Sequence, residues 1–312
     1  MTDKTLLSQI SEDYYLNKLS FGEISEKYHL SRYLINKYLN EALKTGVVKI
    51  EITATANRNA QLEQIFKEHY PDVNCYIIQD DTTATATAEL LSNYAATIVV
   101  KHLAHDDHVV GMTWGDTMYS LIEGIDSNPL DQIKFTQFVG ENMKYNSTAG
   151  SVRIVERAAK KMGGEFLTLP SPLYVLNNDV REGMYQEASL KNTLSQARDM
   201  DTILTGIGTL ASLESVPVWN NQLTSLFPGV ELNEVAGMIY GRPFDIKGRV
   251  LNSTSDKVLG LSMAEILAVP KRIAVVRSKE KSAAVLGALR GKLATDIVFS
   301  EALAYQVLNL EK

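Results

Sequence analysis

Apolar side chains recur at helical spacing in a segment near the start of the chain, between residues 20 and 49. One face of its second half is apolar, with a 3.6-residue period, at Ile35, Tyr38, Leu39, Ala42 and Leu43. The opposite face carries side chains that contact phosphates or base edges in DNA complexes, namely Arg32, Tyr33, Asn36, Lys37 and Asn40. A helix that only packed in a core would bury both sides, so the polar face favours DNA binding.

Helix-capping residues divide the same segment into two short helices with a tight turn between them. Ser20 is placed to cap the first helix, with Glu23 at the reciprocal position of a capping box, and Ser31 is placed to cap the second. Residues 29–30 form the turn, and Gly46 suits the left-handed conformation that ends a helix. This pattern predicts a helix-turn-helix, and the alternative is an ordinary helical hairpin in a larger helical domain. The residues expected to contact DNA are Ser31, Arg32, Tyr33, Asn36 and Lys37.

Beyond residue 54, short apolar runs alternate with helical patterns, which is typical of βαβ units and a mostly parallel sheet. The expected strands span residues 73–78, 109–112, 135–140, 166–169, 202–205, 273–277 and 297–299. The expected helices span residues 6–19, 60–70, 84–103, 115–123, 151–162, 190–198, 281–290 and 301–308. We also expect a short strand at 47–52, a linker at 54–59, and an antiparallel hairpin at 240–251 that turns at residues 247–248.

The predicted fold class is therefore α/β, in two domains. Residues 1–54 form a helix-turn-helix DNA-binding domain. Residues 55–312 form a Rossmann-like, mostly parallel α/β domain for effector binding and oligomerisation.

In composition the chain is ordinary globular material, with 45% hydrophobic and 22% charged residues. Its one cysteine, Cys75, excludes an internal disulfide framework, suits a reducing cytosol, and lies in an apolar run where burial is expected. No apolar segment approaches membrane-spanning length, and the N-terminus lacks the apolar core of a signal peptide. We therefore expect a cytoplasmic protein with no membrane partner.

Charge is distributed unevenly between the two predicted domains. The net charge of −6 argues against nonspecific nucleic-acid binding by the whole surface. Residues 1–52 hold seven basic and seven acidic side chains, so the remainder of the chain carries the net negative charge. A neutral helix-turn-helix on an acidic body is expected to need specific base contacts and the avidity of a homo-oligomer to hold DNA.

Candidate ligand residues lie where predicted strands meet helices, because open α/β sheets bind ligands at the carboxyl ends of their strands. The clearest such junction follows the strand at 109–112. Gly115 allows a tight turn, and Thr113 and Thr117 place hydroxyls beside the free N–H groups of a helix N-terminus, a ready phosphate site. Trp114 favours a binding role, since a large aromatic side chain at a strand end is costly unless it lines something. An ordinary capped turn is the alternative.

Three further junctions offer polar or flexible groups. The stretch after Gly140 is rich in hydroxyls, and Gly206 either lets the backbone approach a ligand or serves only the turn. The turn at 277–281 is cationic, and a lysine at a helix N-terminus opposes the helix dipole, so Lys281 implies an anionic partner unless it is a solvated surface residue. Asp245 is a candidate for that partner or for a contact to a sugar hydroxyl. The effector-binding candidates are Thr113, Trp114, Gly115, Thr117, Gly140, Thr148, Gly206, Asp245, Arg277 and Lys281.

Catalytic and metal-binding motifs are sparse. His102, His105 and His108 have metal-like spacing but fall at the polar end of a helix without a cysteine pair, so no metal site is expected. No nucleophile elbow, P-loop or dinucleotide fingerprint is present, and we expect neither a cofactor nor catalysis. A sugar-phosphate isomerase or aminohydrolase with an accessory helical domain is the alternative, but no acid–base pair for one pocket is identifiable. A ligand sensor whose helix-turn-helix contacts protein instead of DNA is a third possibility.

Several motifs resemble the SorC family of bacterial sugar-responsive transcriptional regulators, and the resemblance covers nearly the whole chain. They are Leu-Ser-Arg (30–32), VGMTWGDTM (110–118), LPSPLYV (169–175), GIG (206–208), FDIKG (244–248) and LRG (289–291). The resemblance implies an effector domain similar to sugar-phosphate isomerases and deaminases, a homodimer or homotetramer, and a phosphorylated sugar as inducer. It also implies that Thr113, Gly115 and Thr117 hold the phosphate and that Asp245 and Lys281 contact the sugar.

The chain departs from the family pattern at four places. Met238 stands where the family usually has an acidic residue, residues 277–278 are Arg-Ser in place of Gly-Gly, and residues 299–301 are Phe-Ser-Glu in place of Thr-Asp-Glu. Val139 stands where some members carry a basic residue, so a Schiff base is not expected there. Either Arg277 supplies the missing positive charge or the site accepts a different ligand.

The sequence thus predicts a DNA-binding transcriptional regulator of a carbohydrate-utilisation operon, controlled by a small phosphorylated sugar. A two-fold assembly predicts a palindromic double-stranded operator. Ligand binding is expected to change how the subunits pair and hence the spacing of their recognition helices. Dimer and tetramer, and repression and activation, are all compatible with the sequence.

Overall fold

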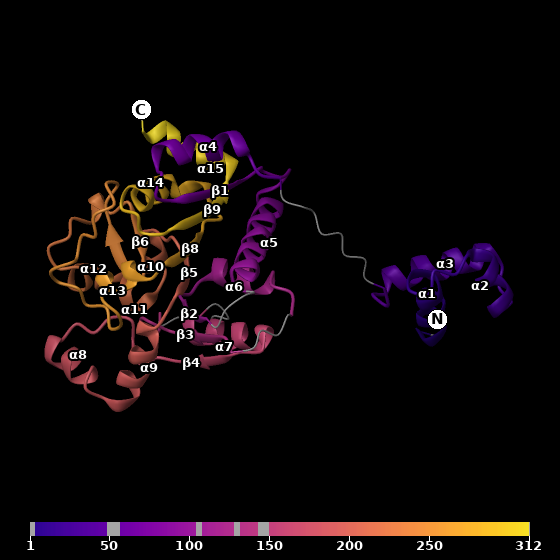
Figure 1. Cartoon of the computed structure of the whole chain (residues 1–312), viewed down its shortest axis with the longest axis horizontal. Helices are drawn as coiled ribbons and strands as arrows, with labels where there is room; N and C mark the ends of the chain where they lie inside the picture. The colour runs from indigo at the N-terminus through magenta and orange to yellow at the C-terminus, as the bar shows by residue number, and fades with distance from the viewer. Residues whose placement is uncertain (1–3, 49–56, 104–107, 128–131, 143–149, 312) are drawn as a thin grey trace. The chain divides into compact units, whose positions relative to one another are not determined.

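The computed structural model describes residues 4–48, 57–103, 108–127, 132–142 and 150–311. The chain divides into two compact units, Met1–Ala54 and Thr55–Lys312 (Figure 1). Each unit has its own hydrophobic core, and the two are described separately.

The N-terminal unit consists of three helices, α1 (Lys4–Tyr15), α2 (Phe21–Tyr28) and α3 (Arg32–Lys44). The predicted caps of the last two are confirmed. The Ser20 hydroxyl accepts from the Glu23 N–H while the Glu23 carboxylate accepts from the Ser20 N–H, and the Ser31 hydroxyl accepts from the Leu34 N–H. His29 adopts the left-handed conformation in the turn between α2 and α3, as does Gly46 after α3. The first helix ends before the predicted Leu19, because the chain turns there with Lys18 at a φ of 57°.

The core of this unit is small, and an ion pair between a buried aspartate and an exposed lysine lies beside it. Ile10, Ile24 and Ile35 are fully buried where the three helices meet. Beside them the buried Asp13 of α1 accepts from Lys27 at 2.8 Å and from the Tyr28 hydroxyl at 2.7 Å, both on α2. These contacts, first that of Lys27, lower the pKa of Asp13 to about 2. The Asp13 carboxylate therefore holds α1 against α2.

The C-terminal unit is built on a seven-stranded sheet in the order β1-β9-β8-β5-β2-β3-β4, and every recorded pairing in it is parallel. The strands are β1 (Asn74–Ile78), β2 (Val109–Met112), β3 (Lys134–Thr136), β4 (Glu165–Leu167), β5 (Thr202–Gly206), β8 (Lys271–Val275) and β9 (Asp296–Ser300). The predicted parallel α/β fold is confirmed.

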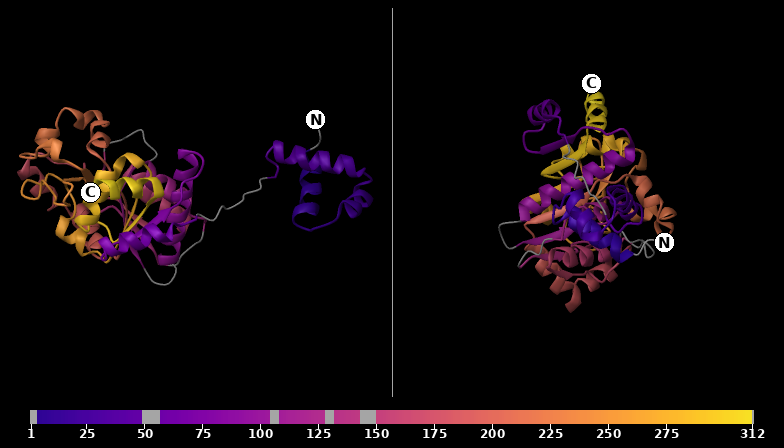
Figure 2. Two further views of the ribbon diagram at one scale, coloured as in Figure 1. Left: turned by 90° about the horizontal axis from the view of Figure 1, so that it is seen from above. Right: turned by 90° about the vertical axis from the view of Figure 1, so that its right-hand side faces the viewer.

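Helices cover both faces of the sheet (Figures 1 and 2). One face packs against α5 (Ala84–Leu103), α6 (Asp116–Glu123) and α7 (Ser151–Met162). The other packs against α4 (Ala60–His69), α9 (Ala188–Arg198), α14 (Ser282–Arg290) and α15 (Glu301–Leu310). Successive strand residues serve opposite faces, since Ile297 and Phe299 of β9 join one core and Val298 joins the other. This two-sided burial explains why the strands read as continuous apolar runs.

A second group of short elements lies between β4 and β8 in the sequence. It comprises α8 (Asn178–Met184), α10 (Leu210–Glu214), α11 (Pro217–Asn220), α12 (Leu223–Leu226), α13 (Met263–Ala268), the antiparallel pair β6 (Gly237–Ile239) and β7 (Arg242–Phe244), and the 3₁₀ turn at Leu232–Glu234. A further 3₁₀ turn, Lys279–Lys281, precedes α14. None of the short helices was predicted, because four to seven residues are too few to show a helical period.

The predicted hairpin at 240–251 is only partly correct. The main antiparallel pair turns at Tyr240 and Gly241, which both have positive φ (53° and 80°) as a tight two-residue hairpin requires. The predicted turn at 247–248 exists, but it is flanked only by an isolated bridge between Phe244 and Val250. Tyrosine at a positive-φ position is uncommon, so the first turn has no recognisable signal in the sequence.

Three other expectations need correction or lie outside the described residues. The strand predicted at 135–140 is shorter in the structure, where β3 spans Lys134–Thr136. The end of the predicted linker is part of the C-terminal unit, because Arg58 bridges to Ile78 and the Asn59 N–H donates to the Ile77 carbonyl at 2.8 Å. Most of the predicted strand at 47–52 lies outside the described residues, and residues 47–48 are not in a strand. Cys75 is buried as expected. In the described part of the chain, no helix has the length and apolarity needed to cross a membrane.

Replacing Asp13 by asparagine is expected to destabilise the N-terminal unit by about 1–2 kcal/mol at pH 7, since the exposed Lys27 is partly screened by solvent. The folded-state pKa of Asp13 is below its ordinary value of 3.8, so its stabilising contribution is present above that value and is lost as the pH falls toward 2. Hydrogen exchange of the α1–α3 amides in the full chain measures this difference. The control is Glu12→Gln, an exposed neighbour on α1. Equal protection of the Asp13→Asn variant and the unaltered protein at pH 7 would contradict the assignment.

Candidate functional site

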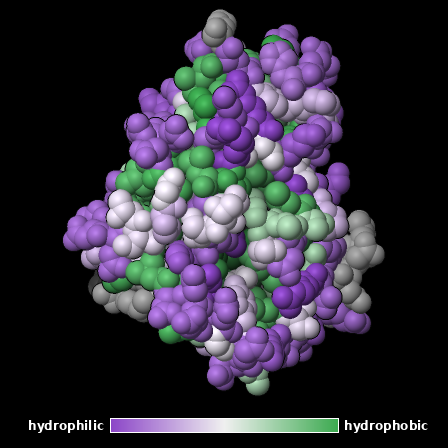
Figure 3. All heavy atoms as spheres, turned by 90° about the vertical axis from the view of Figure 1, so that its left-hand side faces the viewer, coloured by the Kyte–Doolittle hydropathy of each residue, from purple (hydrophilic) through white to green (hydrophobic). Residues whose placement is uncertain are grey.

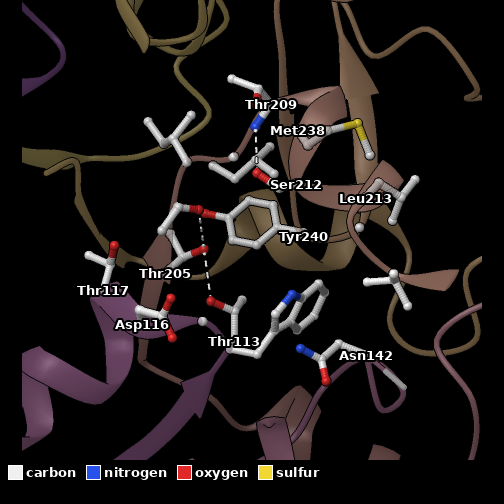
Figure 4. A pocket seen from close by; sticks show the side chains of 18 of the residues that line it. Thr113, Asp116, Thr117, Asn142, Thr205, Thr209, Ser212, Leu213, Met238 and Tyr240 are labelled. Atoms are coloured by element: carbon white, nitrogen blue, oxygen red, sulfur yellow. Dashed lines mark hydrogen bonds between the residues drawn. The ribbon is translucent and has the colours of Figure 1, made fainter. Parts of the chain in front are cut away.

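A cavity of about 250 Å³ lies at the carboxyl ends of β2 and β5 (Figure 4). Most of its wall comes from the β2–α6 turn, the segment from the end of β5 to α11, and the β6–β7 hairpin. Lys281, in the turn before α14, and two further residues, Asn142 and Tyr174, complete the lining. The parallel register that pairs Met112 with Leu204 brings the ends of β2 and β5 side by side. The cavity is thus placed where parallel sheets bind ligands.

The β2–α6 turn presents a helix N-terminus to this cavity. Gly115 is the N-cap of α6, has a φ of 105°, and provides no side-chain hydrogen bond to the first helical turn. The first N–H groups of α6 therefore lack a side-chain partner, and a helix end of this kind attracts anions. Thr113 and Thr117 add hydroxyls to the same wall, and Thr113 Oγ1 lies 3.2 Å from Thr205 Oγ1 on β5.

Lys281 supplies a positive charge on the cavity wall. Its Nζ donates to the Ile207 carbonyl at 2.7 Å. This hydrogen bond connects the turn after β8, which carries Lys281, with the loop after β5, which carries Ile207. Burial, and to a lesser degree the neighbouring Arg277, lower the pKa of Lys281. Both causes disfavour an unpaired ammonium, so an anion in the cavity would stabilise the charged form of Lys281. Asp116 brings an exposed carboxylate to the rim, which an anionic ligand would have to avoid.

Six of the predicted effector residues line the cavity, and they are Thr113, Trp114, Gly115, Thr117, Gly206 and Lys281. Arg277 is not among the lining residues. Its Nη1 donates to Ser120 Oγ at 2.7 Å and to the Asp116 carbonyl, so it braces α6 from behind. Arg277 therefore does not place its positive charge on the wall of this cavity, as one of the two alternatives from the sequence expected.

Two other predicted residues, Asp245 and Gly140, do not line the cavity. Asp245 accepts from the N–H groups of Lys247 and Arg249 and from the Arg249 side chain, so its carboxylate stabilises its own turn. Gly140 packs so closely on the Pro172 carbonyl that a side chain would collide with it, which explains a glycine there without a ligand. Thr148 lies outside the described residues.

The remaining lining residues are not among the predicted effector-binding residues. They are Asp116, Asn142, Tyr174, Thr205, Ile207, Gly208, Thr209, Ser212, Leu213, Val216, Trp219, Met238, Ile239, Tyr240 and Gly241. Of these, Asp116, Ile207, Gly208 and Tyr174 stand in motifs that resemble the family, and Met238 stands at one of the departures from its pattern. Trp219 lies on a four-residue helix, and no pattern in the sequence connects that helix with the end of β2.

The predicted DNA-contacting side chains all lie on the solvent-exposed face of α3. Ile35 and Leu39 are buried on its other face, and Tyr33 is 76% exposed. The Ser31 hydroxyl is occupied as the helix cap, and the Asn40 amide donates to the Asn36 carbonyl. Arg32 and Lys37 extend from the first half of this face, where a recognition helix makes its base contacts.

The sequence analysis expected no metal site at His102, His105 and His108. Of these three histidines, His105 lies outside the described residues. His102 and His108 lie near Asp201 at the amino ends of β2 and β5, the sheet edge opposite the cavity. One ring nitrogen of each histidine contacts a neighbour: His108 Nδ1 lies 2.7 Å from Asp201 Oδ1 and His102 Nε2 lies 2.8 Å from Thr202 Oγ1. The other ring nitrogen of His108, Nε2, is buried without a hydrogen-bond partner among the described residues. This network connects the end of α5 to the two strands, and we assign it no ligand.

Comparison with known proteins identifies relatives over the whole chain. A sequence model of the family described as “Putative sugar-binding domain” matches residues 54–309. The “Deoxyribonucleoside regulator” of Bacillus subtilis (strain 168) is 23% identical over 301 residues, which cover 95% of each protein. The “Sorbitol operon regulator” of Klebsiella pneumoniae is 24% identical over 310 residues, which cover 98% of each. “Transcriptional regulator LsrR” of Escherichia coli (strain K12) is 21% identical over 316 residues, covering 99% of this chain and 96% of that protein. These relatives are regulators and not enzymes.

Solved structures share the fold. The full-length sorbitol operon regulator SorC from Klebsiella pneumoniae superimposes with a TM-score of 0.77 at 22% identity, covering 99% of both chains. A transcriptional regulator from Streptococcus pneumoniae TIGR4 gives a TM-score of 0.70 at 21% identity, covering 80% of this chain and 97% of the other. The chain therefore belongs to the SorC family of sugar-binding transcriptional regulators, and residues 54–309 are its sugar-binding domain.

Proposed function

We propose that this protein binds operator DNA through α3 and controls a carbohydrate-utilisation operon in response to a small phosphorylated sugar. The observation that carries the effector half of the proposal is the uncapped N-terminus of α6, which faces the cavity together with Lys281. A dianionic phosphate suits both, because N–H groups and an ammonium attract the same charge. The rest of a small sugar would then fill the remainder of the cavity.

The relatives support the carbohydrate part of the proposal through their names. One is called a sorbitol operon regulator and another a deoxyribonucleoside regulator, so proteins of this kind are connected with sugars, sugar alcohols or nucleosides. The enzyme interpretation receives no such support, because the relatives named above are regulators. We therefore retain regulation as the proposal and assign no catalytic residue.

The DNA half of the proposal depends on α3. Its exposed face offers Arg32 for base edges and Lys37 for phosphates, while the equal numbers of acidic and basic side chains in residues 1–52 give little general attraction to DNA. One such helix would bind weakly. We infer that a homodimer or homotetramer presents pairs of α3 helices to a palindromic operator, since two linked contacts multiply affinity.

Coupling between the two halves is proposed to act through subunit pairing. A ligand shifts an equilibrium between assemblies only if it binds one of them more tightly. An effector bound between the ends of β2 and β5 and the β6–β7 hairpin would favour one arrangement of the C-terminal units. That arrangement would set the spacing of the recognition helices and hence the operator affinity.

Replacing Lys281 by glutamine is expected to weaken the binding of phosphorylated sugars by about 1.5–3 kcal/mol, the usual contribution of a charge-assisted hydrogen bond. A thermal-shift screen of pentose and hexose phosphates measures it, because a ligand that binds only the folded state raises the melting temperature. Lys279→Gln is the matched control, since Lys279 lies on the same turn, is exposed, and does not line the cavity. An unchanged shift in the Lys281 variant would remove this lysine from the site.

Replacing Arg32 by alanine is expected to reduce specific operator affinity by about 1–3 kcal/mol if the guanidinium contacts a base edge. Fluorescence anisotropy with DNA from upstream of the protein's own gene measures the loss. Lys44→Ala serves as the control, because Lys44 is exposed at the opposite end of α3. Equal affinities of the Arg32 variant and the unaltered protein would exclude Arg32 from base recognition.

A further inference from the structure

The cavity has two chemically different sides. In Figure 4 the hydroxyl-bearing Thr113, Thr117 and Thr205 lie on one side, and Met238 and Leu213 lie on the opposite side, where Thr209 and Ser212 lie beside Met238. Val216, Trp219 and Tyr174 also line the cavity, so several apolar or aromatic side chains contribute to its wall. A ligand held at the α6 N-terminus would therefore extend from a polar region toward an apolar one.

The aromatic hydroxyl groups of the wall are already engaged elsewhere. The Tyr174 hydroxyl donates to the Gly241 carbonyl at 2.6 Å, and the Tyr240 hydroxyl donates to the Leu293 carbonyl at 2.9 Å. The hydroxyl protons are thus used within the protein, and both rings are almost completely buried. These two residues offer a ligand mainly the surfaces of their rings.

Other polar groups nearby also have partners in the protein. The Gly208 N–H donates to the Met238 carbonyl at 2.8 Å, and the Met238 N–H donates to the Gly208 carbonyl at 2.9 Å. Ser212 Oγ accepts from the Thr209 N–H, and the buried Asn142 also has a partner in the protein. A ligand hydroxyl placed against Met238 would lose its hydration and find few available partners.

The apolar side is held in place by packing. Trp219 is 5% exposed and meets Tyr174 edge to face, with ring centroids 5.1 Å apart. Tyr174 meets Phe227 in the same way at 5.8 Å. The surface of the molecule shows hydrophobic side chains mixed with hydrophilic ones in many places (Figure 3), but these rings are buried. A rigid apolar wall of this kind selects ligands by shape and by the absence of polar groups.

We propose that the effector is a phosphate monoester whose end remote from the phosphate is poor in hydroxyl groups and packs against Leu213, Trp219 and Met238. The proposal rests on the proposed function, because it takes the phosphate to lie at α6 and Lys281. The chemical class is a short carbon skeleton, deoxygenated at its distal end. A cavity of about 250 Å³ limits that skeleton to a few carbon atoms beyond the phosphate.

The experiment compares three probes by calorimetry with the full chain: inorganic phosphate, n-pentyl phosphate and ribitol 5-phosphate. The two esters share a five-carbon chain and a phosphate and differ in the hydroxyls. We expect n-pentyl phosphate to bind about tenfold or more tightly than ribitol 5-phosphate, the scale on which an apolar pocket discriminates between such groups. Lys281→Gln should weaken both esters, which shows that the phosphate of each is bound in this cavity and that the alkyl chain is not adhering elsewhere.

Variants of Met238 test the wall directly. Met238→Asn adds hydrogen-bonding groups and is expected to reduce or reverse the preference for n-pentyl phosphate, whereas Met238→Leu should keep it. Val218→Asn is the control, since Val218 lies next to Trp219 on α11 but is 51% exposed and does not line the cavity. Melting temperatures without ligand show whether each variant is folded. If the Met238→Asn variant is unfolded, the Met238→Leu variant still allows the binding of the two esters to be compared.

The possible failures are distinguishable. If ribitol 5-phosphate binds as tightly as n-pentyl phosphate or more so, with both dependent on Lys281, the phosphate site stands and the apolar-end proposal is overturned. If neither ester nor inorganic phosphate binds, the phosphate site itself is wrong and both proposals fail. An undiminished preference in a folded Met238→Asn variant would also contradict the assigned wall.

Discussion

The parallel pairing of β2 with β5 is the constraint on which the rest of the site depends. It aligns Met112 with Leu204, so that Thr113, just after β2, and Thr205, near the end of β5, have their hydroxyl oxygens 3.2 Å apart. The chain must leave the sheet at this point, and Gly115 allows it to turn directly into α6 without a capping side chain. The result is an unsatisfied helix N-terminus beside a strand end, and Lys281 reaches the same space from the turn after β8. The anion-attracting character of the cavity follows from the fold at this crossing.

The elements predicted best from the sequence are long helices and strands with mostly buried side chains. The helix at 84–103 and the strand at 109–112 have the predicted bounds, because twenty residues of helical pattern and a short, mostly buried apolar run are each clear signals. The same reasoning located the β2–α6 turn and Lys281 on the cavity wall. It failed for α10, α11 and α12, because each helix is too short to show a period. Leu213 of α10, Trp219 of α11 and Val216 between these two helices all line the cavity.

Asp245 illustrates a different limit of prediction. An aspartate in this motif suits a sugar contact, but the Asp245 carboxylate accepts hydrogen bonds from the N–H groups of Lys247 and Arg249 in its own turn. Whether an aspartate serves its own turn or a ligand depends on backbone geometry that a sequence does not reveal. Arg277 is similar, because a cation at a strand end can face the cavity or brace the adjacent helix, and in this fold it braces α6. In both cases the sequence located a polar group near the site but not the direction in which it acts.

The measurement that tests the account most directly is operator affinity with and without phosphorylated ligands, each beside its unphosphorylated counterpart. Fluorescence anisotropy with the protein's own upstream DNA would be recorded across pentose, hexose and short alkyl phosphates. The account predicts that at least one phosphorylated compound changes operator affinity while its unphosphorylated partner does not, and that operator DNA changes the affinity for that compound by the same factor. An operator affinity that no phosphorylated compound alters, or that the unphosphorylated compounds alter equally, would contradict it.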